Sequence, residues 1–333
     1  MKALVSSLLA AVGVPAFFAW RNRRRLPILM YHGLVERPLV PACWHQLEVA
    51  AFRRQIAWVA AHHRVLPLEE ALARLADGTL PERSLAVTFD DGYRSNLVLG
   101  LPILEEFRVP ATVFLVTDLV GTGDVPWADR LYLALARTKA SSATSAALAL
   151  AEAPLSSDAD RARAYETAVR AAKALPRVAK DAALARLFAD LGQDGSFDPG
   201  DFRMLSWDDV AALSRSGLVT VASHTRTHQI LSRCTDAEVR AEVGPAHEEL
   251  SRRVGRAPRV MAYPVGRRID YDARAIAAVA EAGIPFALTT VEGLAGPGSA
   301  PLELPRLGIG HDLAYSRFRL LVTGALAALR GSR

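Results

Sequence analysis

The feature that most constrains the fold is a regular alternation of short apolar runs with longer helical stretches along the 333-residue chain. Strand-like runs recur at residues 26–32, 85–89, 111–116, 218–223, 259–263 and 286–290. Stretches with helical character lie between most of them, at residues 47–62, 95–107, 236–254 and 272–283. This alternation predicts a parallel sheet, because a parallel connection needs a crossover long enough to hold a helix. The pattern leaves open whether the sheet is open or closed into a barrel.

Length and composition fit one large α/β domain, expected over residues 26–333, that carries an insertion. A chain of this size with 51% hydrophobic residues can bury a substantial core, which excludes disorder. Residues 127–191 break the alternation and are rich in alanine and charge, so we expect a helical insertion at about 121–203. It offers no cluster of convergent polar groups, which favours a packing or lid element without chemistry.

The first 25 residues combine an apolar stretch with four arginines. Residues 1–20 are almost free of charge, and Arg21, Arg23, Arg24 and Arg25 follow them. This arrangement is typical of a membrane-associating segment, and the positive-inside rule then places the domain on the cytoplasmic side of an inner membrane. The alternative is a cleaved signal that exports the domain to the periplasm. The chain shows no other basic cluster interleaved with aromatic residues, so we expect no nucleic-acid partner.

Two adjacent carboxylates end one of the apolar runs. Asp90 and Asp91 follow residues 85–89 and precede Gly92. In barrels and parallel sheets, catalytic groups gather at the carboxyl ends of the strands. Neighbouring acids repel each other unless a cation takes one as a ligand and leaves the other as a base. The alternative is a solvated Asp-Asp-Gly turn.

Two histidines follow another apolar run in the same way. His224 and His228 come after residues 218–222, and on one helical turn this i, i+4 spacing lets both imidazoles reach one ion. With one aspartate they make three protein ligands and leave room for water and substrate, as in catalytic zinc sites. The same set occurs in non-haem iron oxygenases, so the ligands alone leave redox chemistry open.

A tight loop follows a third run. Pro264, Val265 and Gly266 follow Tyr263, the last of the strand-like residues 259–263. A rigid loop of this kind can aim a backbone N–H, at Tyr263 or Val265, toward a developing oxyanion. The alternative is an ordinary strand-ending turn.

Taken in order, these segments resemble the three motifs of the polysaccharide deacetylases of the NodB-homology type, carbohydrate esterase family 4. Residues 88–92 resemble the first motif, residues 224–228 the second, and residues 263–266 a variant of the third. The likeness extends over about residues 26–320, apart from the insertion. It implies a distorted (β/α) barrel with fewer than eight repeats that removes acetyl groups from N-acetylated sugars with the help of a metal. Two further segments, residues 27–32 and 304–306, resemble the subgroup that includes bacterial exopolysaccharide deacetylases.

The resemblance assigns roles residue by residue. It makes Asp90 the base, and Asp91, His224 and His228 the ligands of a divalent metal, with zinc as the expected ion and cobalt, nickel or iron as alternatives. Such a metal acidifies its water and polarises the amide carbonyl, while Asp90 takes the proton as water attacks.

Two departures from the family pattern assign further residues. Many members place an arginine in the third motif to hold the base, where this chain has Ala262, so we expect Arg306 to replace it from another strand. Many members also supply a general acid from a histidine in a late Leu-x-x-His motif, which His311 matches poorly. His32 is the preferred proton donor, because the first and last strands of a closed barrel are neighbours.

The sequence therefore predicts a hydrolase that removes N-acetyl groups from a cell-envelope or exported polysaccharide, or from its lipid-linked precursor. One alternative is a catalytically silent module for glycan binding or assembly. Another is an amidohydrolase that acts on a small non-sugar amide such as a formamide. The intact Asp-Asp and His-His pairs argue against the silent module, since a binding site needs no spare carboxylate beside a metal ligand.

Overall fold

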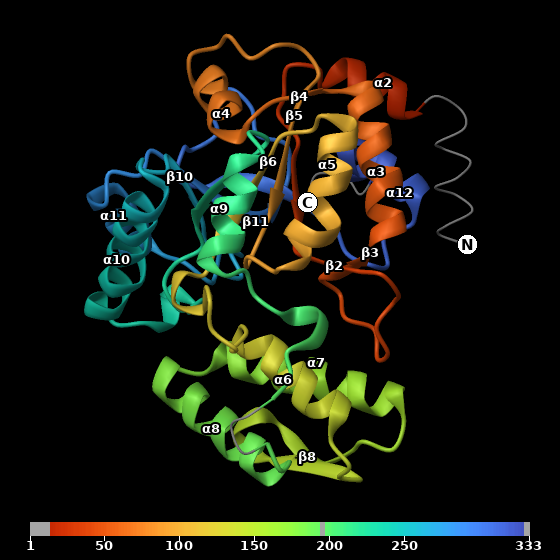
Figure 1. The fold of residues 1–333 in the computed structure, drawn as a ribbon, viewed down its shortest axis with the longest axis vertical. Helices are drawn as coiled ribbons and strands as arrows, with labels where there is room; N and C mark the ends of the chain where they lie inside the picture. The colour runs from red at the N-terminus through yellow and green to blue at the C-terminus, as the bar shows by residue number, and fades with distance from the viewer. Residues whose placement is uncertain (1–13, 194–196, 330–333) are drawn as a thin grey trace.

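Seven parallel strands close into a barrel in the computed structural model, which describes residues 14–193 and 197–329 (Figure 1). Around the ring the order is β1, β12, β11, β10, β9, β6 and β5, and β5 pairs with β1 to close it. The strands are β1 (Ile28–Tyr31), β5 (Ser84–Phe89), β6 (Ala111–Leu115), β9 (Val219–Ser223), β10 (Val260–Ala262), β11 (Phe286–Glu292) and β12 (Leu304–Gly308). The predicted barrel with fewer than eight repeats is confirmed.

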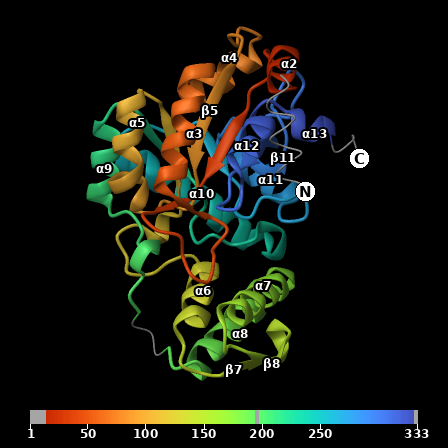
Figure 2. The ribbon, with the colours of Figure 1, turned by 90° about the vertical axis from the view of Figure 1, so that its right-hand side faces the viewer.

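Helices surround this barrel in Figures 1 and 2. They are α3 (Val49–His62), α4 (Leu68–Ala76), α5 (Leu101–Phe107), α9 (Trp207–Arg215), α10 (Asp236–Val254), α11 (Ala273–Glu281), α12 (Tyr315–Val322) and α13 (Ala325–Leu329). A π-helical turn, η1 (Asn96–Gly100), precedes α5 in the stretch predicted as one helix. Short strands next to the ring form further pairs: β4 (Arg64–Val65) pairs with β5, and β2 (Gly33–Val35) pairs with β3 (Gln46–Glu48).

Alternate residues along the barrel strands belong to two separate apolar clusters. Ala86 and Ala222 belong to the cluster that fills the barrel interior, whereas Val87 belongs to the cluster that packs under the outer helices. This follows from the two-residue repeat of a strand, whose side chains point alternately to its two faces. The same repeat, continued past the strand ends, directs the side chains of Asp90 and His224 into the mouth of the barrel.

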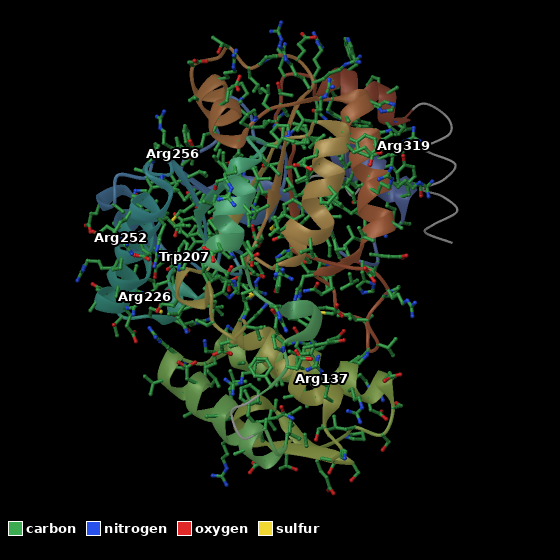
Figure 3. The ribbon with its side chains drawn as sticks, viewed as in Figure 1. Arg137, Trp207, Arg226, Arg252, Arg256 and Arg319 are labelled. Atoms are coloured by element: carbon green, nitrogen blue, oxygen red, sulfur yellow. The ribbon has the colours of Figure 1, made fainter. Side chains whose placement is uncertain are left out.

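The chain between β6 and β9 forms a separate lobe at that mouth (Figures 1 and 2). It contains α6 (Trp127–Arg137), a hairpin of β7 (Ser142–Ser145) and β8 (Leu150–Pro154), α7 (Asp158–Ala174) and α8 (Arg177–Asp190). The lobe buries an apolar cluster of its own, which includes Leu131, Leu148 and Leu184. Arg137, labelled in Figure 3, ties the end of α6 to the carbonyl oxygen of Asp198 on the returning chain.

The helical character predicted for residues 127–191 agrees with these helices, but the hairpin was not predicted. Its strands are short and contain several alanine and serine residues, which have little preference for strands. The division of the chain into domains at these boundaries stays a prediction.

The membrane-associating segment predicted at residues 1–25 lies partly outside the described residues. Its described part contains α2 (Val14–Arg21), which packs against α12 and α13 through Val14 and Phe18. Phe17 and Trp20 on the same helix are exposed. Within residues 14–193 and 197–329, no helix has the length and apolar character needed to cross a membrane.

Candidate active site

Asp90 is buried in the mouth of the barrel and is bound by a single arginine. Arg306 of β12 donates from Nη1 to Oδ1 at 2.6 Å and from Nη2 to Oδ2 at 2.7 Å, and its Nε donates to the carbonyl oxygen of Thr289 at 2.9 Å. Burial opposes ionisation of Asp90, but the charge and the hydrogen bonds of Arg306 outweigh it and hold the pKa of Asp90 below its usual value. Asp90 is therefore a carboxylate at neutral pH.

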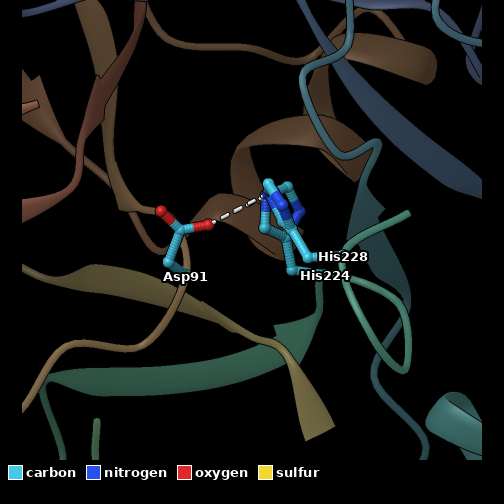
Figure 4. Close-up of side chains that lie close together, drawn as sticks. All are labelled: Asp91, His224 and His228. Atoms are coloured by element: carbon cyan, nitrogen blue, oxygen red, sulfur yellow. Dashed lines mark ion pairs between the residues drawn. The ribbon is translucent and has the colours of Figure 1, made fainter. Parts of the chain in front are cut away.

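Asp91, His224 and His228 form a compact group of ligand atoms beside Asp90 (Figure 4). One ligand atom from each residue lies within 4.8 Å of the others. Asp91 Oδ1 lies 3.2 Å from His228 Nε2 and 3.5 Å from His224 Nε2. Within the described part of the chain, this buried Oδ1 accepts no hydrogen bond. One carboxylate and two imidazoles around an unsatisfied oxygen fit a divalent cation such as zinc.

A backbone contact sets the orientation of one imidazole. His224 donates from Nδ1 to the carbonyl oxygen of Ala262 at 2.8 Å, because a carbonyl can only accept. Burial and the neighbouring His228 lower the pKa of His224 and outweigh the aspartates, so the ring is neutral at neutral pH. Its Nε2 therefore carries a lone pair directed toward Asp91, as metal ligation requires.

The two histidines do not share a helical turn, so that part of the sequence prediction is wrong. Residues 224–228 form a loop in which Thr225 and His228 have φ angles of 64° and 60°, in the left-handed region. Glu242 of α10 holds this loop, because its carboxylate accepts the N–H of Thr227 at 2.8 Å and its carbonyl accepts the N–H of Arg226 at 3.0 Å. Left-handed residues outside glycine each cost about 1–3 kcal/mol and persist where the surrounding structure imposes them.

The loop after β10 corrects the predicted role of Tyr263. The backbone N–H of Tyr263 donates to the carbonyl oxygen of Leu288 at 3.0 Å, so this N–H is not free to serve as an oxyanion donor, and the ring of Tyr263 stacks on Tyr271. The N–H of Gly266 is likewise engaged, with the carbonyl oxygen of Pro264. Val265 lines the cleft with a φ angle of 59°, which leaves its N–H as the candidate donor.

These groups line a cleft of about 260 Å³ between the barrel mouth and the inserted lobe. The lobe contributes Trp127, Asp129, Tyr165 and Lys173 to the wall of the cleft. The insertion thus brings polar side chains to the cleft, contrary to the expected lack of convergent polar groups, and its role as a packing or lid element without chemistry stays a prediction. A larger cavity of about 590 Å³ lies elsewhere, among arginines 37, 94 and 203, and contains none of the predicted site residues.

Of the two histidines considered as proton donors, His32 lies in the cleft and His311 does not. His32 lines the cleft, and burial lowers its pKa to about 4, so it is neutral at neutral pH. His311 lies outside the cleft, beside a separate small cavity, and its N–H donates to the carbonyl oxygen of Trp44 at 3.0 Å.

Sequence reasoning missed a fourth histidine in the cleft. His45 contacts Oδ1 of Asp129 through Nε2 at 2.7 Å. Burial lowers the pKa of His45, but Cys43 and Asp129 outweigh it and raise that pKa well above its usual value. No sequence signal pairs these residues, because Asp129 belongs to the inserted lobe and lies 84 positions further along the chain.

The chain resembles known proteins in both sequence and fold. A family model described as polysaccharide deacetylase matches residues 77–287. The poly-beta-1,6-N-acetyl-D-glucosamine N-deacetylase of Staphylococcus epidermidis is 35% identical over 72 residues, which cover 21% of this chain and 25% of the relative. The protein of the same description from Staphylococcus aureus is 33% identical over 78 residues, 23% of this chain and 27% of the relative. The aligned part thus spans about a quarter of the length of these curated relatives.

Solved structures extend the likeness in fold to most of the chain. The Streptococcus pyogenes deacetylase PplD in complex with acetate superposes with a TM-score of 0.59 and 16% identity, over 90% of this chain and 98% of its own. IcaB from Ammonifex degensii superposes with a TM-score of 0.59 and 17% identity, over 90% of this chain and 97% of its own. At such low identity the superpositions establish the fold alone. Because the family model covers well over half of the residues, from 77 to 287 of 333, the chain belongs to the polysaccharide deacetylase family.

Proposed function

We propose that this protein is a metal-dependent deacetylase that hydrolyses N-acetyl groups on a cell-envelope or exported polysaccharide, or on its lipid-linked precursor. The observation that carries the proposal is the division between the two adjacent carboxylates. Asp91 faces His224 and His228 with an unsatisfied oxygen, whereas Arg306 holds Asp90 in its ionised form. A module that only binds glycans needs no ionised carboxylate beside a set of metal ligands.

Asp91, His224 and His228 would hold a divalent ion, and zinc fits this ligand set, with cobalt, nickel or iron as alternatives. When bound, such an ion supplies a Lewis acid beside the amide to be cleaved. Asp90 accepts the proton of the attacking water, and Arg306 keeps both carboxylate oxygens in place while it does so. We assign to the N–H of Val265, a residue that lines the cleft, the stabilisation of the negative charge that develops on the amide oxygen.

The leaving amine needs a proton, which we assign to a pair of histidines in the cleft. The rings of His32 and His45 lie 5.7 Å apart, centroid to centroid. His45, held by Asp129, carries a proton at neutral pH, whereas His32 does not. His45 is therefore the proton source, and His32 is the neighbouring imidazole that can relay the proton within the cleft.

Two indoles favour a sugar substrate over a small amide. Trp44 lines the cleft with 46% of its surface exposed, and Trp127 lines it from the inserted lobe. The indole of Trp44 lies so close to the chain that a Cβ added at Gly310 would come within 2.3 Å of its Nε1. Flat, rigid indoles offer apolar surface to the C–H face of a pyranose ring, which a formamide does not have.

The test is an acetate-release assay with purified protein over N-acetylated glycans and lipid-linked N-acetyl sugars. We expect release from at least one of them, loss of release with a chelator, and recovery when zinc or cobalt is added back. Binding of a glycan without release of acetate would support the silent module instead. A purified protein that takes up no stoichiometric divalent ion would refute the mechanism.

A further inference from the structure

A continuous line of buried polar groups runs from the ligand set into the inserted lobe. The hydroxyl of Tyr93 lies 3.0 Å from Oδ2 of Asp91 and 2.5 Å from Oδ2 of Asp129. The other carboxylate oxygen of Asp129 lies 2.7 Å from Nε2 of His45. Tyr93 and Asp129 are buried to 0% and 1% exposure, so water does not complete these contacts. Asp91 therefore contacts the two histidine ligands through Oδ1, and this line of polar groups through Oδ2.

The hydroxyl between the two carboxylates has one hydrogen and cannot donate it to both at once. The shorter distance places this hydrogen toward Asp129, which leaves the hydroxyl oxygen facing Oδ2 of Asp91. Two oxygens that both carry lone pairs repel each other in a buried site. A cation bound to Asp91 relieves this repulsion, so the arrangement favours the metal-bound form of Asp91 over the metal-free form.

The lobe holds Asp129 firmly at this position. Asp129 lies in the first turn of α6, where the helix dipole stabilises a carboxylate, and its N–H donates to the carbonyl oxygen of Pro126 at 2.9 Å. One turn further along α6, Tyr132 donates its hydroxyl hydrogen to the carbonyl oxygen of Pro41 at 2.5 Å and packs on Phe202. These contacts attach α6 to the barrel loops on two sides.

We propose that Asp129 is a positioning residue of the metal centre, which acts on the ligand Asp91 through the hydroxyl of Tyr93. The inserted lobe is then a functional part of the centre, because it supplies the carboxylate that orients the ligand carboxylate. The proposal rests on the metal centre proposed above, but it is independent of which glycan is the substrate. Outer groups that orient metal ligands change metal affinity by about 10–100-fold when they are removed.

The experiment measures the zinc dissociation constant of the metal-free full-length protein by competition with a chromophoric chelator. The variants are Tyr93→Phe, Asp129→Asn and the double variant, with Asp124→Asn as the control. Asp124 precedes α6 on the same lobe, and its carboxylate is 49% exposed on the surface. We expect each single substitution to weaken zinc binding by roughly 10–100-fold. We expect the double variant to bind zinc no more weakly than the single variant with the lower zinc affinity. Both substitutions interrupt the same line of contacts from Asp129 through Tyr93 to Asp91. The control should bind zinc as the unsubstituted protein does.

Two outcomes would overturn the proposed role of Asp129, and a third would show instead that the proposed metal centre does not exist. Unchanged zinc affinity in Tyr93→Phe overturns it, and this variant decides the question even if Asp129→Asn does not fold, as judged by circular dichroism. Additive losses in the double variant overturn the path through Tyr93, because they mean that Asp129 acts independently. If the unsubstituted protein binds neither zinc nor cobalt, nickel or iron, the proposed function itself fails. That result differs from normal binding of the metal that the variants do not alter.

Discussion

At the scale of single residues, two neighbouring aspartates differ in role because the backbone turns between them. Asp90 continues the inward repeat of β5 and meets Arg306 inside the barrel. Asp91 has a φ angle of 70°, in the left-handed region, which directs its carboxylate to His224 and His228 instead. This conformation costs about 1–3 kcal/mol, and because of it two adjacent carboxylates point in different directions and can serve as a base and as a metal ligand.

Substitution of Asp90 by asparagine should remove turnover and leave metal binding nearly intact. The amide cannot accept the proton of the attacking water, and the loss of a general base lowers kcat by about 10²–10⁴-fold. His224→Ala is the contrasting variant, because it removes a ligand and should lose both zinc and activity. Metal content and initial rates of acetate release, measured on the same preparations, check both expectations. Acetate release at the normal rate by Asp90→Asn would show that the assigned base is wrong.

Substitution of Arg306 by methionine should destabilise the fold more than the loss of an exposed ion pair does. Arg306 is fully buried against the buried Asp90, and removal of one partner of a buried pair costs about 3–5 kcal/mol, because the other charge stays behind. Arg256→Met is the matched control, since Arg256 pairs with Glu69 at 2.8 Å with 46% of its side chain exposed. Such an exposed pair contributes about 0–1 kcal/mol. Chemical denaturation measures both changes, and equal losses would contradict the assigned burial.

At the scale of the elements, the sequence predicts the strands and the residues at their ends, because both depend on local patterns. Asp90 and His224 each follow an apolar run, and a parallel sheet brings the carboxyl ends of such runs to one mouth. The turn of 224–228 was predicted wrongly, because Thr225 is left-handed there and tertiary contacts, with α10 and with the chain after β6, impose this conformation. The His45 and Asp129 pair could not be predicted, since it depends on where the lobe docks.

Two glycines lie at the end of β12, next to His311, which was compared with the histidine of the late Leu-x-x-His motif. Gly308 and Gly310 lie against the indole of Trp44, and His311 next to them bonds to the backbone of Trp44. A side chain at Gly310 would displace the indole from the cleft. We expect Gly310→Val and Trp44→Ala both to raise KM for a glycan and to leave kcat within a few-fold, because they remove a surface that binds the sugar. A fall in kcat at unchanged KM would contradict this role.

At the scale of the whole molecule, histidines that are neutral in the folded state should make the fold sensitive to acid. Burial lowers the pKa of His63 to about 4, and in the unfolded chain a histidine has a pKa of about 6.5. Between these values the unfolded state binds a proton that the folded state does not, so stability falls as pH drops from about 6.5 to about 4. His32 shifts in the same direction. The melting temperature of His63→Gln should fall less over this range than that of the unsubstituted protein, with the exposed neighbour His62→Gln as the control. An identical pH dependence in all three proteins would contradict the prediction.

The N-terminal helix bears on where the whole molecule lies in the cell. On α2, Phe17 and Trp20 are 55% and 58% exposed, and an arginine-rich stretch follows them. Exposed aromatic side chains beside basic residues suit the interface of an anionic membrane. We therefore expect Phe17→Ser with Trp20→Ser to move protein from the membrane fraction to the soluble fraction. The control Val178→Ser, at a residue 77% exposed on the inserted lobe, should leave the distribution unchanged.

We predict the side of the membrane from the same arginines, because the positive-inside rule favours their retention in the cytoplasm. A topology reporter fused after Arg333 should therefore be active in the cytoplasm, where a lipid-linked precursor would be the accessible substrate. Activity of the reporter in the periplasm alone would support export of the domain, and an assembled polysaccharide would then be the better substrate to assay. Because α2 packs on α12 and α13 near the other end of the chain, the fusion reports on the folded barrel itself.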